Sequence, residues 1–243
     1  MQITKFQNKI GKLRVAENHR YLEFVDGTPF FYLGDTAWEL FHRLTLEEAK
    51  HYLDNRAAKG FTVIQAVALA ELGGVDVPNA NGDLPLMNQD PTTPNEAYFK
   101  YVDEIVNYAA ELKLFIGLLP TWGSRWKLVG SNRNGIFTPE NAYTYGEFLG
   151  KRYRDSPVIW ILGGDAFVES EEEYAIIEAM ALGLKAGDGG EHLITFHPRG
   201  PGRSSETFHQ AEWLDFNMSQ SSHGARDHDN GIFVDHDYDL DPP

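Results

Sequence analysis

The feature that most constrains this chain is a series of short segments that are apolar almost throughout, rather than at alternate positions. The six segments are 30–33, 61–69, 114–119, 158–162, 192–196 and 214–218. Strands of this kind are buried on both faces, which is typical of parallel sheets covered by helices. Since helical patterns lie between the segments, the order of elements predicts the α/β class.

Several helix starts carry recognisable N-terminal signals. Three pairs fit the capping box, in which each side chain satisfies the other residue's free backbone N–H. These pairs are Thr45 with Glu48, Thr93 with Glu96, and Ser170 with Glu173. Pro139 after Thr138 is a related start, and an apolar face at helical spacing predicts a helix over 94–112. Lys59-Gly60 predicts the end of the first helix.

The number of predicted strands bears on the architecture. Asp26-Gly27 between two apolar runs predicts a β-hairpin before the first helix. Six strands are complete by residue 218, whereas a (β/α)8 barrel has eight in about 250 residues. A single domain over 1–243 is therefore either an open six-stranded sheet or a TIM-type barrel with about six of its eight strands. The acidic stretch 227–243 is expected to be a solvated tail without a final element.

Composition excludes several functional classes. The formal charge of −15 argues against nucleic acid or an anionic membrane surface as a partner. No run of 18 apolar residues occurs, and no signal peptide is evident, which favours a cytoplasmic protein unless a leader has been removed from a periplasmic or secreted one. Since Cys is absent and neither a GxGxxG nor a P-loop motif is present, we expect no thiolate chemistry and no cofactor.

Candidate site residues follow the predicted strands, because chemistry in parallel α/β folds occurs beyond the carboxyl ends of the strands. Asp165 is the leading catalytic candidate, since two glycines before it allow a tight turn and burial would raise its pKa towards that of a general acid. A turn or helix-capping role for Asp165 is the alternative. The candidate substrate-binding residues are Asp35, Trp38, Glu71, Trp122, His197, Gln220 and His223.

Two of these histidines also allow a metal interpretation. His197 and His223 with Asp165 could supply two imidazoles and one carboxylate, although no HxH or HExxH spacing supports such a site. We therefore predict no metal, and retain a metal-assisted hydrolase only as an alternative.

The combined motifs resemble one known family, the apiosidase-like glycoside hydrolases (family 140). The resemblance covers about residues 13–243 and is carried by the segments 26–40, 56–65, 118–123, 158–165 and 216–220. It implies a (β/α)8 barrel that cleaves apiose-containing pectin side chains or related plant glycans with retention. It also implies that Asp165 is the acid/base, and that the nucleophile is a glutamate ending strand seven, shortly after a segment like 238–243. No such glutamate is present in these residues.

Three hypotheses follow. The chain is a glycoside hydrolase whose barrel is completed by a further C-terminal segment or by self-association, a carbohydrate-binding relative without catalysis, or the metal-assisted hydrolase. A polyanionic pectin would also require cations in the cleft of this acidic protein. The basic candidates for that role are Arg125, Lys127, Arg133 and Arg199.

Overall fold

The computed structural model describes residues 10–128, 135–223, 227 and 229–242. The strands are β1 (Leu13–Val15), β2 (Leu22–Phe24), β3 (Pro29–Phe30), β4 (Gly34–Thr36), β5 (Val63–Leu69), β6 (Phe115–Thr121), β7 (Val158–Gly163), β8 (Ile194–His197), β9 (Gly202–Arg203) and β10 (Ser219–Gln220). The helices are α1 (Leu46–Ala58), the 3-10 helix η1 (Met87–Gln89), α2 (Glu96–Glu111), α3 (Gly123–Trp126), α4 (Pro139–Tyr153), α5 (Glu171–Asp188), α6 (Ser205–Phe208) and α7 (Gly231–Tyr238).

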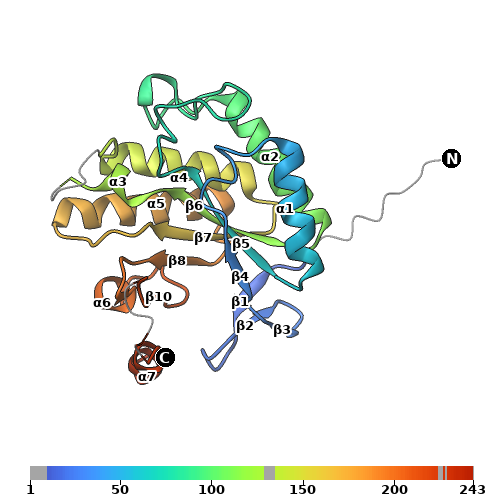
Figure 1. The fold of residues 1–243 in the computed structure, drawn as a ribbon. Coiled ribbons are helices and arrows are strands. Elements are labelled where there is room, and N and C mark those ends of the chain that lie inside the picture. The colour runs from blue at the N-terminus through green and yellow to red at the C-terminus, as the bar shows by residue number, and fades with distance from the viewer. Residues whose placement is uncertain (1–9, 129–134, 224–226, 228, 243) are drawn as a thin grey trace.

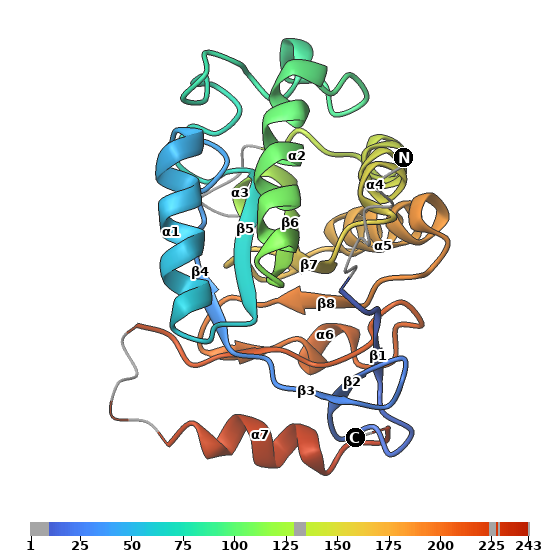
Figure 2. The same ribbon diagram turned by 90° about the vertical axis from the view of Figure 1, so that its right-hand side faces the viewer.

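A parallel sheet organises the molecule. Its five strands lie in the order β4-β5-β6-β7-β8, so each strand is the neighbour of the next one along the chain. The long helices α1, α2, α4 and α5 cover its outer face, while the hairpin β1–β3 and the C-terminal elements lie on the opposite side (Figures 1 and 2). The predicted α/β class is thus confirmed.

Two predicted strands are wrong. The first strand of the parallel sheet is β4, which begins after the predicted segment 30–33, because Phe30 and Tyr32 pack beneath the sheet with the hairpin. The segment 214–218 runs beside β8 but forms no strand, because the Asp215 carboxylate, rather than a backbone carbonyl, accepts the N–H of Ile194 at 2.7 Å. The next strand is β10, which pairs antiparallel with β9.

The predicted helix starts are confirmed in part. The capping box at Thr45 and Glu48 forms as predicted, and Thr138 caps α4. The box at Thr93 does not form, because Asn95 caps α2 through the N–H of Ala97. The acidic tail also differs from expectation, since it contains α7 with Phe233 buried. No helix in the described ranges has both the length and the apolar character that a bilayer crossing requires.

The inner face of the sheet is filled in layers. At the amino ends of the strands, Val63, Phe115 and Ile159 pack with the hairpin side chains, including Phe24 and Phe30. Phe30 and Phe115 meet edge to face at a centroid distance of 5.3 Å, a favoured aromatic geometry. The hairpin therefore closes the lower end of the sheet. A second layer at the carboxyl ends consists of Val67, Leu119, Trp122 and Ile161.

Helices α4 and α5 pack backbone to backbone. Gly146 and Gly150 on α4 face Gly183 and Gly187 on α5, and each pair is four residues apart. A Cβ atom at any of these positions would lie within 3.0 Å of a backbone atom of the other helix. The absence of side chains at the crossing allows the two axes to approach closely.

A buried polar cluster fixes the end of α5. The Asp188 carboxylate, fully buried, accepts hydrogen bonds from Trp160 Nε1 at 2.9 Å and from Gly190 N at 2.8 Å, and pairs with His192 Nδ1 at 2.9 Å. Burial acts to raise the pKa of Asp188, but these partners outweigh it and lower the pKa overall. The lowered pKa means that ionised Asp188 stabilises the fold.

We predict that Asp188→Asn destabilises the full-length protein by about 3 kcal/mol at pH 7, since breaking one half of a buried pair leaves its partner uncompensated. Because the folded pKa is lowered, this difference is present above the ordinary Asp pKa and is lost as the pH falls through the folded value. Urea unfolding between pH 7 and pH 3 measures it. Glu191→Gln, at the exposed Lys12–Glu191 pair, is the control and should change the stability much less, because solvent screens that pair. Equal losses at both sites would contradict the role of Asp188.

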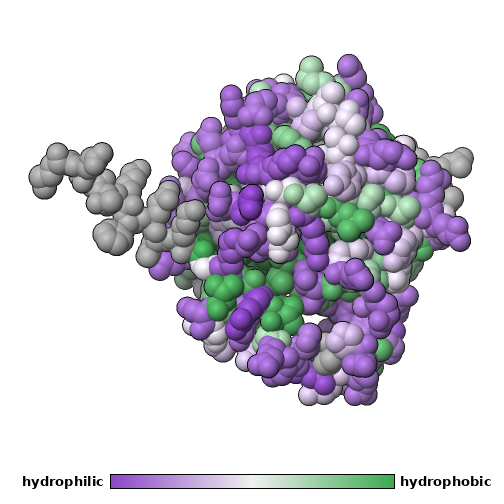
Figure 3. Space-filling view, turned by 180° about the vertical axis from the view of Figure 1, so that it is seen from behind, coloured by the Kyte–Doolittle hydropathy of each residue, from purple (hydrophilic) through white to green (hydrophobic). Residues whose placement is uncertain are grey.

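The sheet is open along β4. Among the strands that the structure describes, β5 is its one partner, and Gly34 and Thr36 are exposed. A cavity of about 470 Å³ lies between the hairpin, the segment 214–219 and α7. Seen from behind, apolar side chains gather in the middle and lower part of the surface (Figure 3). Unpaired strand edges and apolar surface favour association with another chain.

We therefore predict that a protein restricted to residues 1–243 self-associates. Light scattering coupled to size-exclusion chromatography should give a mass above the 27.4 kDa of one chain. A monodisperse monomer that unfolds in one cooperative transition would contradict this expectation.

Candidate active site

Asp165 follows β7 on a tight turn that requires glycine at the two positions before it. Gly163, Gly164 and Asp165 have φ values of 94°, 103° and 55°, so three consecutive residues are left-handed. The turn is held on both sides, since Gly123 N donates to the Gly164 carbonyl at 2.9 Å and Gly164 N donates to the His197 carbonyl at 3.1 Å. A Cβ atom at Gly164 would lie 2.8 Å from Gly123 N. The backbone thus presents Asp165 at the carboxyl end of the sheet, where it is exposed and not buried as the sequence suggested.

His197 connects Asp165 to an aromatic wall. Its Nδ1 accepts the backbone N–H of Asp165 at 3.3 Å. The rings of Trp38, Trp122 and His197 are mutually in contact, with centroid distances of 5.2, 5.6 and 5.9 Å. Burial lowers the pKa of His197, although the Asp165 carboxylate opposes the shift. A neutral ring with an accepting Nδ1 carries its proton on Nε2, which makes Nε2 a hydrogen-bond donor.

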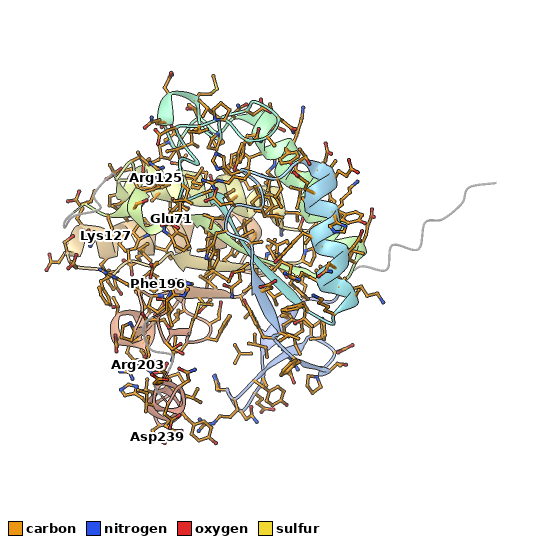
Figure 4. All side chains as sticks on the ribbon, viewed as in Figure 1. Glu71, Arg125, Lys127, Phe196, Arg203 and Asp239 are labelled. Carbon is orange, nitrogen blue, oxygen red and sulfur yellow. The ribbon has the colours of Figure 1, made fainter. Side chains whose placement is uncertain are left out.

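Glu71 brings a second carboxyl group to the same place. It follows β5, and its pKa is raised by burial and by the negative charges of Asp165 and Glu39, while a hydrogen bond with Trp122 opposes the shift. Figure 4 shows Glu71 on the side of the molecule where α3 lies, near Arg125 and Lys127. Asp165, Glu71, Trp38, Trp122 and His197, all predicted site residues, therefore lie together.

Glu39 and His42 hold the loop that carries Glu71, and neither residue was predicted from the sequence. Glu39 Oε1 accepts the N–H of Leu72 at 3.2 Å, and Glu39 Oε2 lies 2.8 Å from His42 Nδ1. His42 Nε2 lies 3.0 Å from the Val77 carbonyl. The i,i+3 spacing of Glu39 and His42, directly after Trp38, is the signal that could have indicated them.

Of the remaining predicted substrate-binding residues, Asp35 points away from Asp165, whereas Gln220 and His223 have surroundings of their own. Asp35 lies on β4 and faces α1, where its carboxylate binds Arg56 and accepts from Tyr52 at 2.9 Å, because alternate strand residues point to opposite faces. The Gln220 side chain lies against Gly200, which would meet its Oε1 if it had a Cβ atom. His223 is exposed in the loop after β10.

The residues suggested as metal ligands do not come together. Among the described residues, no three His, Asp or Glu side chains converge in a group that could hold a metal ion. Asp165, His197 and His223 therefore do not form the site that this alternative required.

The basic candidates have different surroundings. Lys127 is buried and binds Glu169 and Glu173 within the protein. Arg125 is buried as well, with Nη2 at 3.4 Å from Asp76. Arg199 lies over the ring of Phe167, and Arg133 lies outside the described residues. Lys127 thus has a partner within the fold in place of an anionic substrate.

The raised pKa of Glu71 leads to a stability prediction. Because the folded pKa lies above the unfolded one, protonated Glu71 is favoured by folding, and this contribution is lost as the pH rises through the folded value. Glu71→Gln removes the charge that burial disfavours. We expect its melting temperature to exceed that of the wild type by roughly 1–3 °C at pH 7 and to match it at pH 4.

Differential scanning calorimetry at the two pH values measures this difference. Glu104→Gln, at an exposed position on α2, is the control and should show no pH-dependent gain. A Glu71→Gln variant that melts below the wild type at pH 7 would contradict the view that the buried charge of Glu71 destabilises the fold.

Comparisons with known proteins agree with this architecture. A glycoside hydrolase structure is 38% identical with a TM-score of 0.76, and the match covers 88% of this chain and 46% of that one. A family 5 glycoside hydrolase from Bacteroides vulgatus is 33% identical with a TM-score of 0.82, covering 96% of this chain and 52% of the other. The endo-1,4-β-mannanase from Rhizomucor miehei, at 15% identity and a TM-score of 0.55, is similar in fold; it covers 76% of this chain and 60% of that one.

These matches confirm the predicted barrel type, of which this chain forms a part. The chain spans about half the length of the two more similar structures. A comparison with curated proteins found no match. The family model described as the catalytic domain of apiosidase-like proteins matches residues 16–243. The chain therefore belongs to the apiosidase-like catalytic domain family.

Proposed function

We propose that this protein is a glycosidase that acts on side chains of plant cell-wall glycans, with retention and with Asp165 as the general acid/base. Family membership and the two glycoside hydrolase structures above 30% identity support the reaction class. The observation that carries the role of Asp165 is its place on a fixed turn at the carboxyl end of β7, beside His197. Apiose-containing pectin is the substrate that the family resemblance favours.

In the proposed mechanism, Asp165 protonates the leaving glycosidic oxygen and then removes a proton from the attacking water. Trp38 and Trp122 contact the sugar ring, and Nε2 of His197 donates to a hydroxyl group. Glu71, whose pKa is raised, accepts or donates a further hydrogen bond to the sugar. Asp35 is left out of these roles, because its carboxylate binds Arg56 and Tyr52, and Gln220 and His223 stay candidate substrate-binding residues.

Retention also requires a nucleophile, with the two carboxyl groups about 5–5.5 Å apart. We assign it to a glutamate ending a seventh strand, contributed by polypeptide outside residues 1–243. In a (β/α)8 barrel such a strand would lie next to the segment 214–218, which lines the cavity between the hairpin and α7. Completion of the sheet and completion of the active site would then be the same event.

A carbohydrate-binding relative without catalysis is the second candidate. The contact of Trp38, Trp122 and His197 favours it, because an aromatic wall binds sugar rings whether or not a nucleophile is present. Turnover distinguishes the two functions, since both predict sugar binding.

Asp165→Asn in the full-length protein tests the proposed role. With rhamnogalacturonan II as substrate, chromatography of the released sugars should show a loss of about 10²–10⁴-fold in kcat, the usual contribution of a general acid. Binding of the same glycan, measured by calorimetry, should change little. The anomer formed first, observed by NMR, tests retention.

Asp155→Asn is the matched control, because Asp155 is exposed just before β7, at the amino end of the sheet. It should retain turnover. Near-normal turnover of Asp165→Asn would remove Asp165 from the role. Binding of the glycan by the wild type without any turnover would instead establish the carbohydrate-binding candidate.

A further inference from the structure

A buried cation lies behind the loop that carries Asp165. Lys127 follows α3, and its side chain is only 8% exposed. Its Nζ donates to the Phe167 carbonyl at 3.0 Å, to Glu169 Oε2 at 2.7 Å and to Glu173 Oε2 at 3.0 Å. An ammonium group has three N–H donors, so all three are used by residues 167–173.

Glu173 completes this arrangement from the first turn of α5. Its carboxylate is fully buried and accepts the N–H of Leu128 at 2.9 Å through Oε1 and that of Glu169 at 2.8 Å through Oε2. Two loops are therefore joined through one carboxylate, one following β6 and the other following β7. We call Lys127, Glu169 and Glu173 the Lys127 cluster.

The local sequence rule is broken at this point. Ser170 and Glu173 fit a capping box, and the Ser170 hydroxyl does accept the Glu173 N–H at 3.2 Å. The carboxylate of Glu173, however, accepts hydrogen bonds from the N–H groups of Glu169 and Leu128 and from the Lys127 ammonium. These bonds take the place of the one from the Ser170 N–H that a capping box would have. Departures from local preference tend to occur where a site requires a particular geometry.

The Lys127 cluster lies where it can hold the loop 164–170 in place. Residues 164–170 leave β7 through the left-handed turn and reach α5 at Ser170. Gly123 N and His197 fix the start of this segment, and the Lys127 cluster fixes its end. The side chain of Asp165 is exposed between these two fixed points, so its own contacts do not hold it.

We propose that Lys127 and Glu173 are positioning residues, which hold the loop 164–170 so that Asp165 is placed against the bound sugar. The catalytic half of this inference rests on the proposed function, whereas the structural half does not. A misplacement of about 1 Å at a reacting group can cost 10²-fold in rate, so the ion pair would matter to turnover without touching substrate.

Hydrogen exchange measured by mass spectrometry on the full-length protein tests the structural half. Lys127→Met and Glu173→Gln should exchange at least about tenfold faster in peptides spanning 164–172, because local opening becomes easier where buried contacts are lost. Arg152→Met is the matched control, since Arg152 forms a part-buried ion pair between α2 and α4. Unchanged protection in both variants, or faster exchange throughout the molecule, would overturn the proposal.

Kinetics test the catalytic half. With rhamnogalacturonan II, Lys127→Met should lower kcat by about 10–10²-fold and change KM by less than about threefold. Lys127→Arg, which keeps the charge, should restore most of kcat. With a dinitrophenyl apioside, which needs little acid assistance, the loss should be much smaller.

These readouts separate the possible failures. A fall in kcat that is equal for both substrates, or no fall despite faster local exchange, would overturn the positioning role. If the wild type has no turnover at all, the proposed function fails, and the exchange data alone decide whether the Lys127 cluster holds the loop. Glu173→Gln preserves the side-chain shape, so it gives that answer even if Lys127→Met does not fold.

Discussion

Parallel pairing from β4 to β8 is the interaction on which the rest of this structure depends. Because every strand runs in the same direction, all the following loops lie at one edge, and residues from β5, β6, β7 and β8 meet there although they are far apart in sequence. The same pairing leaves both faces of the sheet in need of cover. Helices supply it on the outside, and the hairpin with the aromatic layer supplies it on the inside.

The two carboxyl groups of the candidate site are held indirectly. Neither Asp165 nor Glu71 has an ion-pair partner among the described residues, and each lies on a loop that other charged groups fix. Glu39 with His42 holds the loop after β5, and Lys127 with Glu173 holds the loop after β7. This division leaves the carboxyl groups free to exchange protons while their backbone stays in place, which suits acid/base chemistry.

The sequence predicted the elements that depend on local patterning. The four strands β5–β8 are apolar almost throughout and nearly all their residues are buried, which makes that pattern easy to recognise. The first strand was misplaced because Phe30 and Tyr32 pack with the hairpin. In the sequence, such a segment has the same apolar pattern as a strand of the parallel sheet. The segment 214–218 failed for a different reason, since the Asp215 side chain replaces a backbone acceptor.

Prediction of the site was limited by the direction of side chains. Residues placed by a strand end, such as Asp165 and Trp122, lie where expected. Asp35 does not, since a shift of one residue along β4 turns a side chain from the inner face to the helices. Lys127 and Glu173 could not be paired from sequence, because nothing local indicates that residues 46 positions apart share a buried bond.

The glycine contact between α4 and α5 has a consequence for how this protein can change over generations. At that crossing, any mutation adds an atom where the opposing backbone already lies, and neither helix can yield without moving the other. Substitution at these four glycines is therefore restricted, and a compensating change would have to occur in two segments at once. Since α5 begins directly after the loop that carries Asp165, this restriction also protects the active-site geometry from gradual drift.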